Sequence, residues 1–411
     1  MDFFTILYLS LIFIGFYYFF LFILIYFQNR KHMFEYFKPL KEYSLSIVIP
    51  CFNGGENIGR TIENLLKSDY PGLKKIIIVD DCSTDNSYEI AKDFEKKDKR
   101  VLVVQTPKNT GGAAGAKNFG AQFVKTELIG FTDDDSYPSK DAISKMVGFF
   151  NDEKVGAVTS RVLVRNRDKL LARVQSIEYK VIAFTRKLFG FIDSIYVTNG
   201  PLSIYRKKAF DNVKGFDEKN LTEDIEITWH FIAKAWKVHM ALNALVYTVV
   251  PHKFKHWLNQ RLRWNVGGIQ TLDKYKKSVF KCGMLGFFIM PYFFVAWVLA
   301  IFGLGFVIYR FSRYLFVQYL ATTYSIEAQT AVIRFSELNL SPTILFFFGV
   351  VLIALGIFYN FTALAYSRKE DKEFKGENIT NVVTYMFIYL LFYPIVLVTS
   401  IYKFLTKNQT W

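Results

Sequence analysis

The chain has 411 residues, which is too long for one typical domain and long enough for two. Hydrophobic residues make up 52% of it, and 43 Phe with 25 Tyr exceed what the core of a soluble protein needs. The formal net charge of +15 suits an anionic partner, such as a membrane surface, a phosphorylated substrate or nucleic acid. The three cysteines, Cys51, Cys82 and Cys282, are scattered without CxxC spacing, which argues against a disulfide framework and a zinc site.

The first predicted element is a long apolar helix. Residues 3–27 (FFTILYLSLIFIGFYYFFLFILIYF) contain no charged residue over 25 positions, which is more than the ~20 residues that cross a bilayer core. A cleavable signal peptide has a basic start, a shorter apolar stretch and a small-residue cleavage site, and none of these is present. We therefore expect an N-terminal transmembrane helix within residues 1–28.

Strands and helices alternate in the next part of the chain, residues 44–250. Short runs rich in Ile and Val predict strands at residues 43–52, 73–83, 100–107 and 127–136, with helical spacing at 57–68, 85–97 and 111–125. Such runs argue for parallel strands with helices on both faces, so we expect an α/β domain with a Rossmann-like sheet. In these sheets ligands bind beyond the carboxyl ends of the strands.

Polar and acidic residues follow each of the four predicted strands. They are Asn53 and Glu56, then Asp80 and Asp81, then residues 109–112, and last the run Asp133, Asp134 and Asp135. Three adjacent carboxylates repel one another; they form either an acidic surface turn or a site for a divalent cation, which would turn the repulsion into attraction. Because all four strand ends meet at one edge of the sheet, we expect a metal–nucleotide site there. Its oxygen ligands suit Mn²⁺ or Mg²⁺.

The last part of the chain predicts further membrane association. Residues 251–283 contain the basic and aromatic run HKFKHWLNQRLRW, which is typical of interfacial amphipathic helices. Within residues 284–411, three apolar segments at 284–309, 343–366 and 379–405 predict a transmembrane region of three helices. Lys and Arg cluster after the first span and between the third and fourth spans, at residues 367–375. The positive-inside rule then places residues 28–283 in the cytoplasm and both termini outside.

Several motifs together resemble one enzyme family. SIVIPCFNGGENIGRTIENLL, IIIVDDCSTDNS, NTGGAAGAKNFG and FTDDDS, in this order, resemble the GT-A domain of inverting family 2 glycosyltransferases. NGPLSIYRKKAF, NLTEDIEITWHF and QRLRW resemble the acceptor half of the membrane-integral members, the processive chitin, hyaluronan, nodulation-oligosaccharide and cellulose synthases. The resemblance covers residues 44–270, and the flanking spans fit the same group.

The resemblance implies a reaction and its partners. The expected reaction is a metal-dependent, inverting transfer of a sugar from a nucleotide diphosphate, a UDP-sugar with N-acetylglucosamine favoured, to a growing glycan at the cytoplasmic face of the plasma membrane. Processive synthesis would be coupled to secretion, and the alternative is a single transfer to a lipid carrier such as polyprenyl phosphate. A non-catalytic membrane module is disfavoured because both the metal pair and the TED aspartate are intact. No nucleic-acid partner is expected, and a homo-oligomer is left open.

The resemblance also implies roles for single residues. Asp224 would be the general base that takes the acceptor proton, with Glu223 as a helper, although Thr222 followed by acids is also an ordinary helix start. In an extended segment alternate side chains share a face. Asp135 would therefore ligate the metal beside Asp133, and Asp134 would point into solvent.

Two larger sets complete the expected site. The nucleotide would contact Cys51, Phe52, Asn53, Glu56, Asp80, Asp81, Lys117 and Asp133, with the choice between Asp80 and Asp81 for the base left open, and Lys117 equally readable as a surface lysine. The diphosphate and acceptor would contact Asn199, Gly200, Pro201, Leu202, Gln260, Arg261, Arg263 and Trp264. Gln260, Arg263 and Trp264 would share one helical face because they lie at i, i+3 and i+4.

Overall fold

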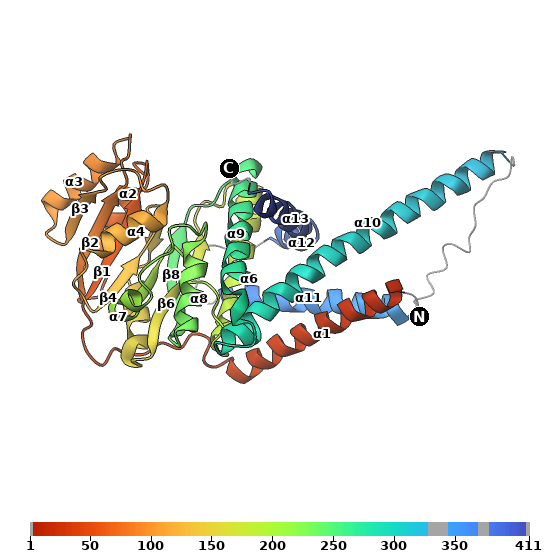
Figure 1. Cartoon of the computed structure of the whole chain (residues 1–411), viewed down its shortest axis with the longest axis horizontal. Helices are drawn as coiled ribbons and strands as arrows, with labels where there is room; N and C mark the ends of the chain where they lie inside the picture. The colour runs from red at the N-terminus through yellow and green to blue at the C-terminus, as the bar shows by residue number, and fades with distance from the viewer. Residues whose placement is uncertain (1–2, 328–343, 369–377, 408–411) are drawn as a thin grey trace.

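The computed structural model describes residues 3–327, 344–368 and 378–407, so the basic segment 367–375 lies outside the described residues from 369 onward. A sheet-containing domain lies at one end of the molecule, and long apolar helices extend from it (Figure 1). This arrangement agrees with the two parts expected from composition.

One mixed sheet of eight strands forms the centre of the domain, in the order β3-β2-β1-β4-β7-β6-β8-β5. The strands are β1 (Leu45–Cys51), β2 (Leu73–Asp80), β3 (Val101–Gln105), β4 (Leu128–Phe131), β5 (Ser136–Pro138), β6 (Val155–Val164), β7 (Ser203–Arg206) and β8 (Lys237–Thr248). β1 pairs in parallel with β2 and β4, and β2 with β3, so the four predicted parallel strands are confirmed. β7 is antiparallel to β4 and β6, and β5 to β8, which makes the sheet mixed.

Helices cover both faces of the parallel half, as alternating side chains require. Ile47 and Ile49 of β1 belong to a core that includes α2, whereas Val48 belongs to a core that includes α4. Gly120 lets α4 approach closely, since a Cβ there would lie 2.5 Å from Val48. The helical elements of the domain are α2 (Ile58–Leu66), α3 (Ser87–Lys97), α4 (Ala113–Ala121), α5 (Ala142–Val147), η1 (Gly148–Asn151), α6 (Leu170–Gly190), α7 (Lys207–Asn212) and α8 (Glu223–Ala233).

The membrane-type helices account for most of the remaining chain. They and their connections are α1 (Phe3–Asn29), α9 (Phe254–Tyr275), η2 (Lys276–Ser278), η3 (Leu285–Ile289), α10 (Met290–Glu327), α11 (Ile344–Arg368), α12 (Ile379–Phe387), η5 (Tyr389–Leu391) and α13 (Phe392–Leu405). Within the described residues, four segments are long and apolar enough to cross a membrane, in agreement with the four predicted spans: Thr5–Asn29, Leu285–Glu327, Phe347–Ser367 and Ile379–Leu405. α1 and α11 lie side by side as they leave the sheet, and α10 extends away at an angle to them (Figure 1).

The fourth apolar segment differs from the other three. A turn at Ile388 and the short η5 interrupt it, which leaves α13 with 14 residues. At ~1.5 Å per residue, α13 is about 21 Å long, less than the ~30 Å of a hydrocarbon core. Figure 1 shows α12 and α13 beside α9, near the domain. Whether this bent segment crosses the bilayer, and on which side each terminus lies, stays a prediction.

Candidate active site

The two aspartates at the end of β2 differ in how many partners they have. Both carboxylate oxygens of Asp81 accept hydrogen bonds, from Thr106 Oγ1 at 2.7 Å and from the amide and hydroxyl of Thr110 at 2.8–3.1 Å. Asp80 accepts from Gln105 Nε2 at 2.8 Å with one oxygen, while its other oxygen has no hydrogen-bond partner among the described residues. Asp81 therefore holds the loops after β2 and β3 together. Asp80 has one carboxylate oxygen, Oδ1, that could accept a hydrogen bond from a ligand.

The loop after β1 is held against the loop after β2. Asn53 adopts a left-handed backbone with φ of 54°, and its side-chain oxygen accepts from the amide of Thr84 at 2.8 Å. Asn53 thus joins the two strand ends where a nucleotide is expected. Phe52 and Glu56 are exposed at this rim, whereas Cys51 is buried.

The triple aspartate departs from the prediction. The segment after β4 turns at Asp134 and Asp135 and is not extended. Asp134 is half-buried, with its side chain against Gly54 and Cys51, so the expectation that it points into solvent is wrong. Burial and the negative charges of Asp135 and Asp133 raise the pKa of Asp134 to about 7. The turn brings all three carboxylates into the protein.

Asp135 is the member of the pair that fits a metal ligand. Its Oδ1 accepts from Ser136 Oγ and Thr248 Oγ1, each at 3.2 Å, which orients the carboxylate. Burial and the negative charge of Asp133 raise the pKa of Asp135 to about 6. A bound cation would relieve the repulsion between these two carboxylates. No group of three or more His, Cys, Asp or Glu forms a metal cluster in the part of the chain that the structure describes. Asp135 and Asp133 could each offer carboxylate oxygens to a divalent cation.

A buried lysine lies at the centre of the acidic residues. Lys117 of α4 has only 3% of its side chain exposed, and its Nζ lies 2.7 Å from Glu223 Oε1 and 3.7 Å from Asp133 Oδ1. The surface alternative for Lys117 is therefore excluded. Although burial favours the neutral form of Glu223, the Lys117 charge keeps the pKa of Glu223 below its usual range. Glu223 is thus an ion-pair partner of Lys117 at neutral pH.

Asp224 lies in the first turn of α8, next to this ion pair. It is half-buried, and its Oδ1 accepts from the amide of Ile225 at 2.9 Å. Burial and the negative charge of Glu223 raise the pKa of Asp224 to about 7, against the opposing effect of Lys117. A carboxylate with a pKa near neutrality can accept a proton at physiological pH. The general-base role of Asp224 agrees with this environment.

The segment before β7 passes directly against Asp133. A Cβ on Gly200 would overlap the Asp133 carboxylate, so only glycine allows this approach. Asn199 is buried, and its Oδ1 accepts from Thr159 Oγ1 at 2.6 Å and from Arg186. Pro201 accepts a hydrogen bond from Thr132 through its carbonyl, and Leu202 is fully buried. The backbone at Gly200 thus borders the candidate acceptor site, while Leu202 belongs to the core.

The QRLRW motif lies on α9, where its two arginines differ. Arg261 is 1% exposed and pairs with Glu178 of α6 at 2.6 Å, which favours a structural role, and its contact with the diphosphate or the acceptor stays a prediction. It also lies over the ring of Trp264, 4.1 Å from the centroid, and donates to Gln260 Oε1 at 3.1 Å. Arg263 is exposed, and its charge lowers the pKa of Glu223 and opposes the raised pKa of Asp133. Arg263 is therefore the motif's free cation at the site.

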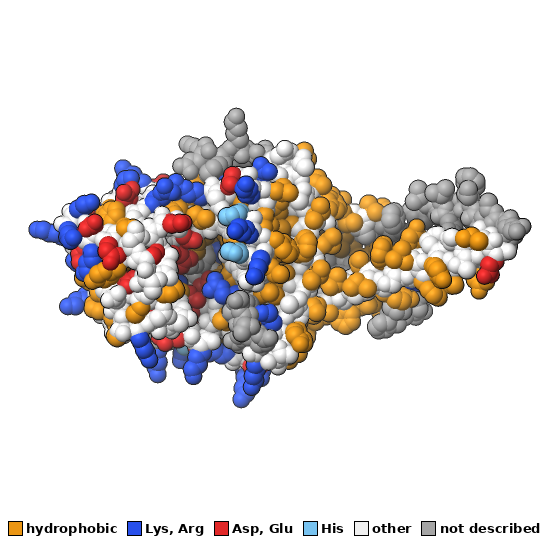
Figure 2. Space-filling view, turned by 90° about the horizontal axis from the view of Figure 1, so that it is seen from above, with side chains coloured by type: hydrophobic (Ala, Val, Ile, Leu, Met, Phe, Trp, Pro, Cys, Tyr) orange, Lys and Arg blue, Asp and Glu red, His pale blue; other side chains and the backbone are white. Residues whose placement is uncertain are grey.

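Figure 2 shows acidic side chains gathered in a hollow between the part of the molecule that holds the sheet and the part that holds the long helices. Basic side chains border the same face. Two further groups of this region were not predicted from the sequence. Thr248, at the end of β8, orients Asp135, and Thr228 Oγ1 donates to the Asp224 carbonyl at 2.6 Å. A lone threonine in a strand or a helix carries no sequence signal for such a role.

Comparison with known proteins agrees with this geometry. Residues 46–214 match the family model described as Glycosyl transferase family 2. This match covers less than half of the chain. Two curated proteins similar to the chain are poly-beta-1,6-N-acetyl-D-glucosamine synthases of Staphylococcus epidermidis. One is 30% identical over 250 residues, 60% of each chain, and the other is 31% identical over 230 residues, 56% of this chain and 55% of the relative. The matches therefore span 55–60% of the length of these relatives.

A solved structure shares the fold of the family 2 domain and its flanking helices. It is the mannosyltransferase PcManGT from Pyrobaculum calidifontis, in complex with GDP-Man and Mn²⁺. The TM-score is 0.59 at 14% sequence identity, over 97% of this chain and 99% of that chain. This likeness establishes the GT-A fold, and at such low identity it concerns the fold alone.

Proposed function

We propose that the protein is an inverting, membrane-integral glycosyltransferase that extends a glycan from UDP-N-acetylglucosamine at the cytoplasmic face of the plasma membrane. One observation carries the proposal: the Asp224 carboxylate lies beside the Lys117–Glu223 ion pair, and the Lys117 ammonium also faces Asp133. A base, a buried cation and a carboxylate pair at the carboxyl ends of parallel strands are the groups that glycosyl transfer from a nucleotide requires.

The donor would bind at the ends of β1 and β2. Uracil presents an N–H between two carbonyls, and the unpartnered oxygen of Asp80 is the acceptor that suits it. Asp81 has no free oxygen and would keep a structural role. Asp135, with Asp133 beside it, would hold Mn²⁺ or Mg²⁺, which when bound neutralises charge on the diphosphate. Arg263 would add a positive charge on the same side.

The acceptor hydroxyl would lie between Asp224 and the anomeric carbon of the donor. Its oxygen attacks that carbon while its proton passes to Asp224, and the bond from the anomeric carbon to the diphosphate breaks. No covalent enzyme intermediate forms, so an α-configured donor gives a β linkage. Trp264 offers a flat ring at which the apolar face of a pyranose can stack.

The choice of sugar and the polymeric product rest on the relatives. The two Staphylococcus epidermidis proteins are named as synthases of poly-beta-1,6-N-acetyl-D-glucosamine, which supports N-acetylglucosamine as the sugar and repeated transfer as the reaction. The four candidate spans support synthesis at the membrane.

The test uses the full-length protein in nanodiscs with labelled UDP-N-acetylglucosamine and Mn²⁺. We expect donor turnover with a product of many sugars, loss of turnover on chelation, and restoration by added Mn²⁺. Asp224→Asn should lower turnover by at least ~100-fold. A single sugar on added polyprenyl phosphate, without polymer, would overturn processive synthesis in favour of lipid-carrier transfer. No turnover with a panel of nucleotide sugars would overturn the enzymatic proposal itself.

A further inference from the structure

One face of α9 packs against the loop that leads into α8, and its contacts follow helical spacing. Gly267, Gln270, Thr271 and Lys274 lie at i, i+3, i+4 and i+7, so they share a face. A Cβ on Gly267 would overlap Thr222, which means that the backbone of α9 approaches the base-bearing segment closely. This stripe continues toward the start of α9 as Trp264 and Arg263.

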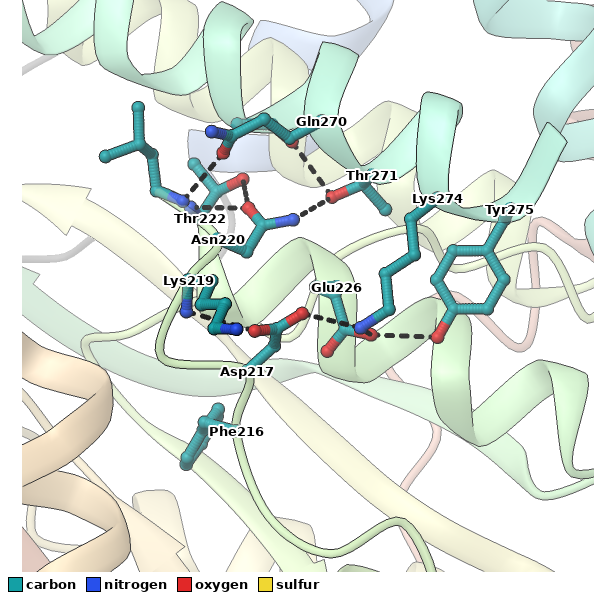
Figure 3. Close-up of polar contacts among 12 residues, drawn as sticks. Phe216, Asp217, Lys219, Asn220, Thr222, Glu226, Gln270, Thr271, Lys274 and Tyr275 are labelled. Carbon is teal, nitrogen blue, oxygen red and sulfur yellow. Dashed lines mark hydrogen bonds and ion pairs between the residues drawn. The ribbon is translucent and has the colours of Figure 1, made fainter. Parts of the chain in front are cut away.

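Two side chains of α9, Gln270 and Thr271, accept hydrogen bonds from the loop that leads into α8. Gln270 Oε1 accepts from the amide of Leu221 at 2.9 Å. Asn220 accepts from the amide of Thr222 with its oxygen at 2.9 Å and donates to Thr271 Oγ1 with its nitrogen at 2.9 Å. Figure 3 shows these contacts above the first turn of α8. Asn220 and Leu221, the two residues before Thr222, are therefore tied to α9.

Ion pairs complete the contact further along α9. Lys274 Nζ lies 2.6 Å from Asp217 Oδ2 and 2.6 Å from Glu226 Oε1, and Tyr275 donates to the same Glu226 oxygen at 2.8 Å (Figure 3). Glu226 is 1% exposed. A buried carboxylate needs a compensating charge, so the removal of Lys274 would leave Glu226 with the neutral hydroxyl of Tyr275 and would loosen the contact between α8 and α9.

The position of these residues connects the two halves of the proposed site. Glu226 follows Asp224 by two residues on α8, and Lys274 lies on the α9 stripe that also carries Arg263 and Trp264. α8 and α9 therefore cannot shift relative to each other without breaking the ion pairs. The distance between the proton acceptor and the residues that face the diphosphate and the acceptor sugar depends on this contact.

We propose that Asp217, Glu226 and Lys274 form an α8–α9 clamp whose function is to position Asp224 against the Arg263–Trp264 end of α9. This inference rests on the proposed function. The clamp residues touch no substrate, so they are positioning residues. Because a misplacement of about 1 Å can cost ~100-fold in rate, a weakened clamp acts on kcat while donor binding at the distant ends of β1 and β2 is kept.

The test compares Lys274→Met, which keeps the aliphatic stem and loses the charge, with Lys274→Arg, which keeps both. The matched control is Lys276→Met, which breaks an exposed pair with Asp273 next to the same end of α9. For the full-length protein in nanodiscs we expect Lys274→Met to lower kcat by about 10- to 100-fold with the donor KM unchanged. We expect Lys274→Arg to recover most of kcat and Lys276→Met to match the wild type.

Hydrogen exchange supplies a readout that does not need turnover. Residues 216–226 should exchange faster in Lys274→Met than in the wild type and the Lys276→Met control. Unchanged exchange would overturn the clamp as a contact. Faster exchange with unchanged kcat would overturn its positioning role, as would a change confined to the donor KM. A wild type without any transfer activity would instead overturn the proposed function, and the exchange result would then report on the contact alone.

Discussion

The ammonium nitrogen of Lys117 lies 2.7 Å from a carboxylate oxygen of Glu223, where only 3% of the lysine side chain is exposed. The same nitrogen faces Asp133 at 3.7 Å, and its charge opposes the raised pKa of Asp224. One buried cation therefore acts on three carboxylates, Asp133 after β4 and Glu223 and Asp224 in the first turn of α8.

Lys117→Met should destabilise the protein and shift its pH dependence. Breaking a buried ion pair by removing one partner costs about 3–5 kcal/mol in the free energy of unfolding. Because the Lys117 charge lowers the pKa of Asp224, its loss should also move the rise of kcat/KM to higher pH. Chemical unfolding and a pH–rate profile check both effects. Lys96→Met, which breaks an exposed pair with Asp93, should change stability by less than ~1 kcal/mol, and an equal loss in both variants would contradict the assignment.

The wild-type pH–rate profile should report the base directly. Asp224 accepts a proton only when it is ionised, and its pKa is raised to about 7. We therefore expect kcat/KM to rise with pH through a midpoint near 7 and to fall about tenfold per pH unit below it. A profile that stays flat between pH 5 and 8 would remove Asp224 from this role.

Asp224→Asn should stabilise the fold at alkaline pH while it abolishes transfer. A raised pKa means that the folded state holds a proton that the unfolded state has released between pH ~4 and ~7, so wild-type stability falls as pH rises through this window. The amide cannot ionise and avoids the loss. Thermal unfolding should give a higher Tm for the variant at pH 8, and the difference should shrink toward pH 4. A lower Tm at pH 8 would argue that the Asp224 carboxylate is favourably paired.

Arg261 and Arg263 should separate stability from catalysis within one motif. Arg261→Ala leaves Glu178 buried without its cation, so we expect a loss of about 3–5 kcal/mol in stability. Arg263 is exposed, and Arg263→Ala should leave the Tm within a degree or two while it lowers kcat/KM by about 10- to 100-fold. Thermal unfolding and turnover of both variants are sufficient. If Arg261→Ala lowered kcat/KM and left the Tm unchanged, Arg261 would be a contact of the diphosphate and not a structural residue.

Gly200→Ala should reduce sugar transfer because it displaces the Asp133 carboxylate. The added methyl group would overlap the Asp133 carboxylate, which must then move away from Lys117. We expect at least a tenfold lower kcat/KM and a weaker response to Mn²⁺. Gly305→Ala on α10 is the matched control, because a Cβ there meets nothing within 4 Å and Gly305 lies outside the candidate site. If Gly200→Ala keeps full activity like the control, the close contact between Gly200 and Asp133 is not needed for sugar transfer.

The local sequence pattern was sufficient to predict the parallel half of the sheet. The Ile- and Val-rich runs that became β1 and β2 are buried on both faces, and their polar ends do meet at one edge. The same reasoning failed for Asp134, because a turn reverses the side-chain alternation that an extended segment would have. It could not separate Asp80 from Asp81, whose difference depends on Thr106 and Thr110 from distant positions.

The burial of Lys117 and Arg261 could not be predicted from the sequence either. Each belongs to a helix whose periodicity alone does not reveal a carboxylate from another helix as its partner. Glu223 lies 106 residues after Lys117, and Glu178 lies 83 residues before Arg261. Ion pairs of this kind depend on how helices pack, which single-sequence patterns do not encode.

The network around Glu178 extends beyond Arg261. Tyr389 donates to Glu178 at 2.7 Å and accepts from Trp257 at 2.6 Å, and Tyr393 also donates to Glu178. Both tyrosines come from the bent apolar segment Ile379–Leu405, which means that phenols of this segment help to hold the helix that carries QRLRW. A fragment that ends before residue 284 would lose these groups, and it would be a poor substitute for the full chain in inhibitor screening or crystallography.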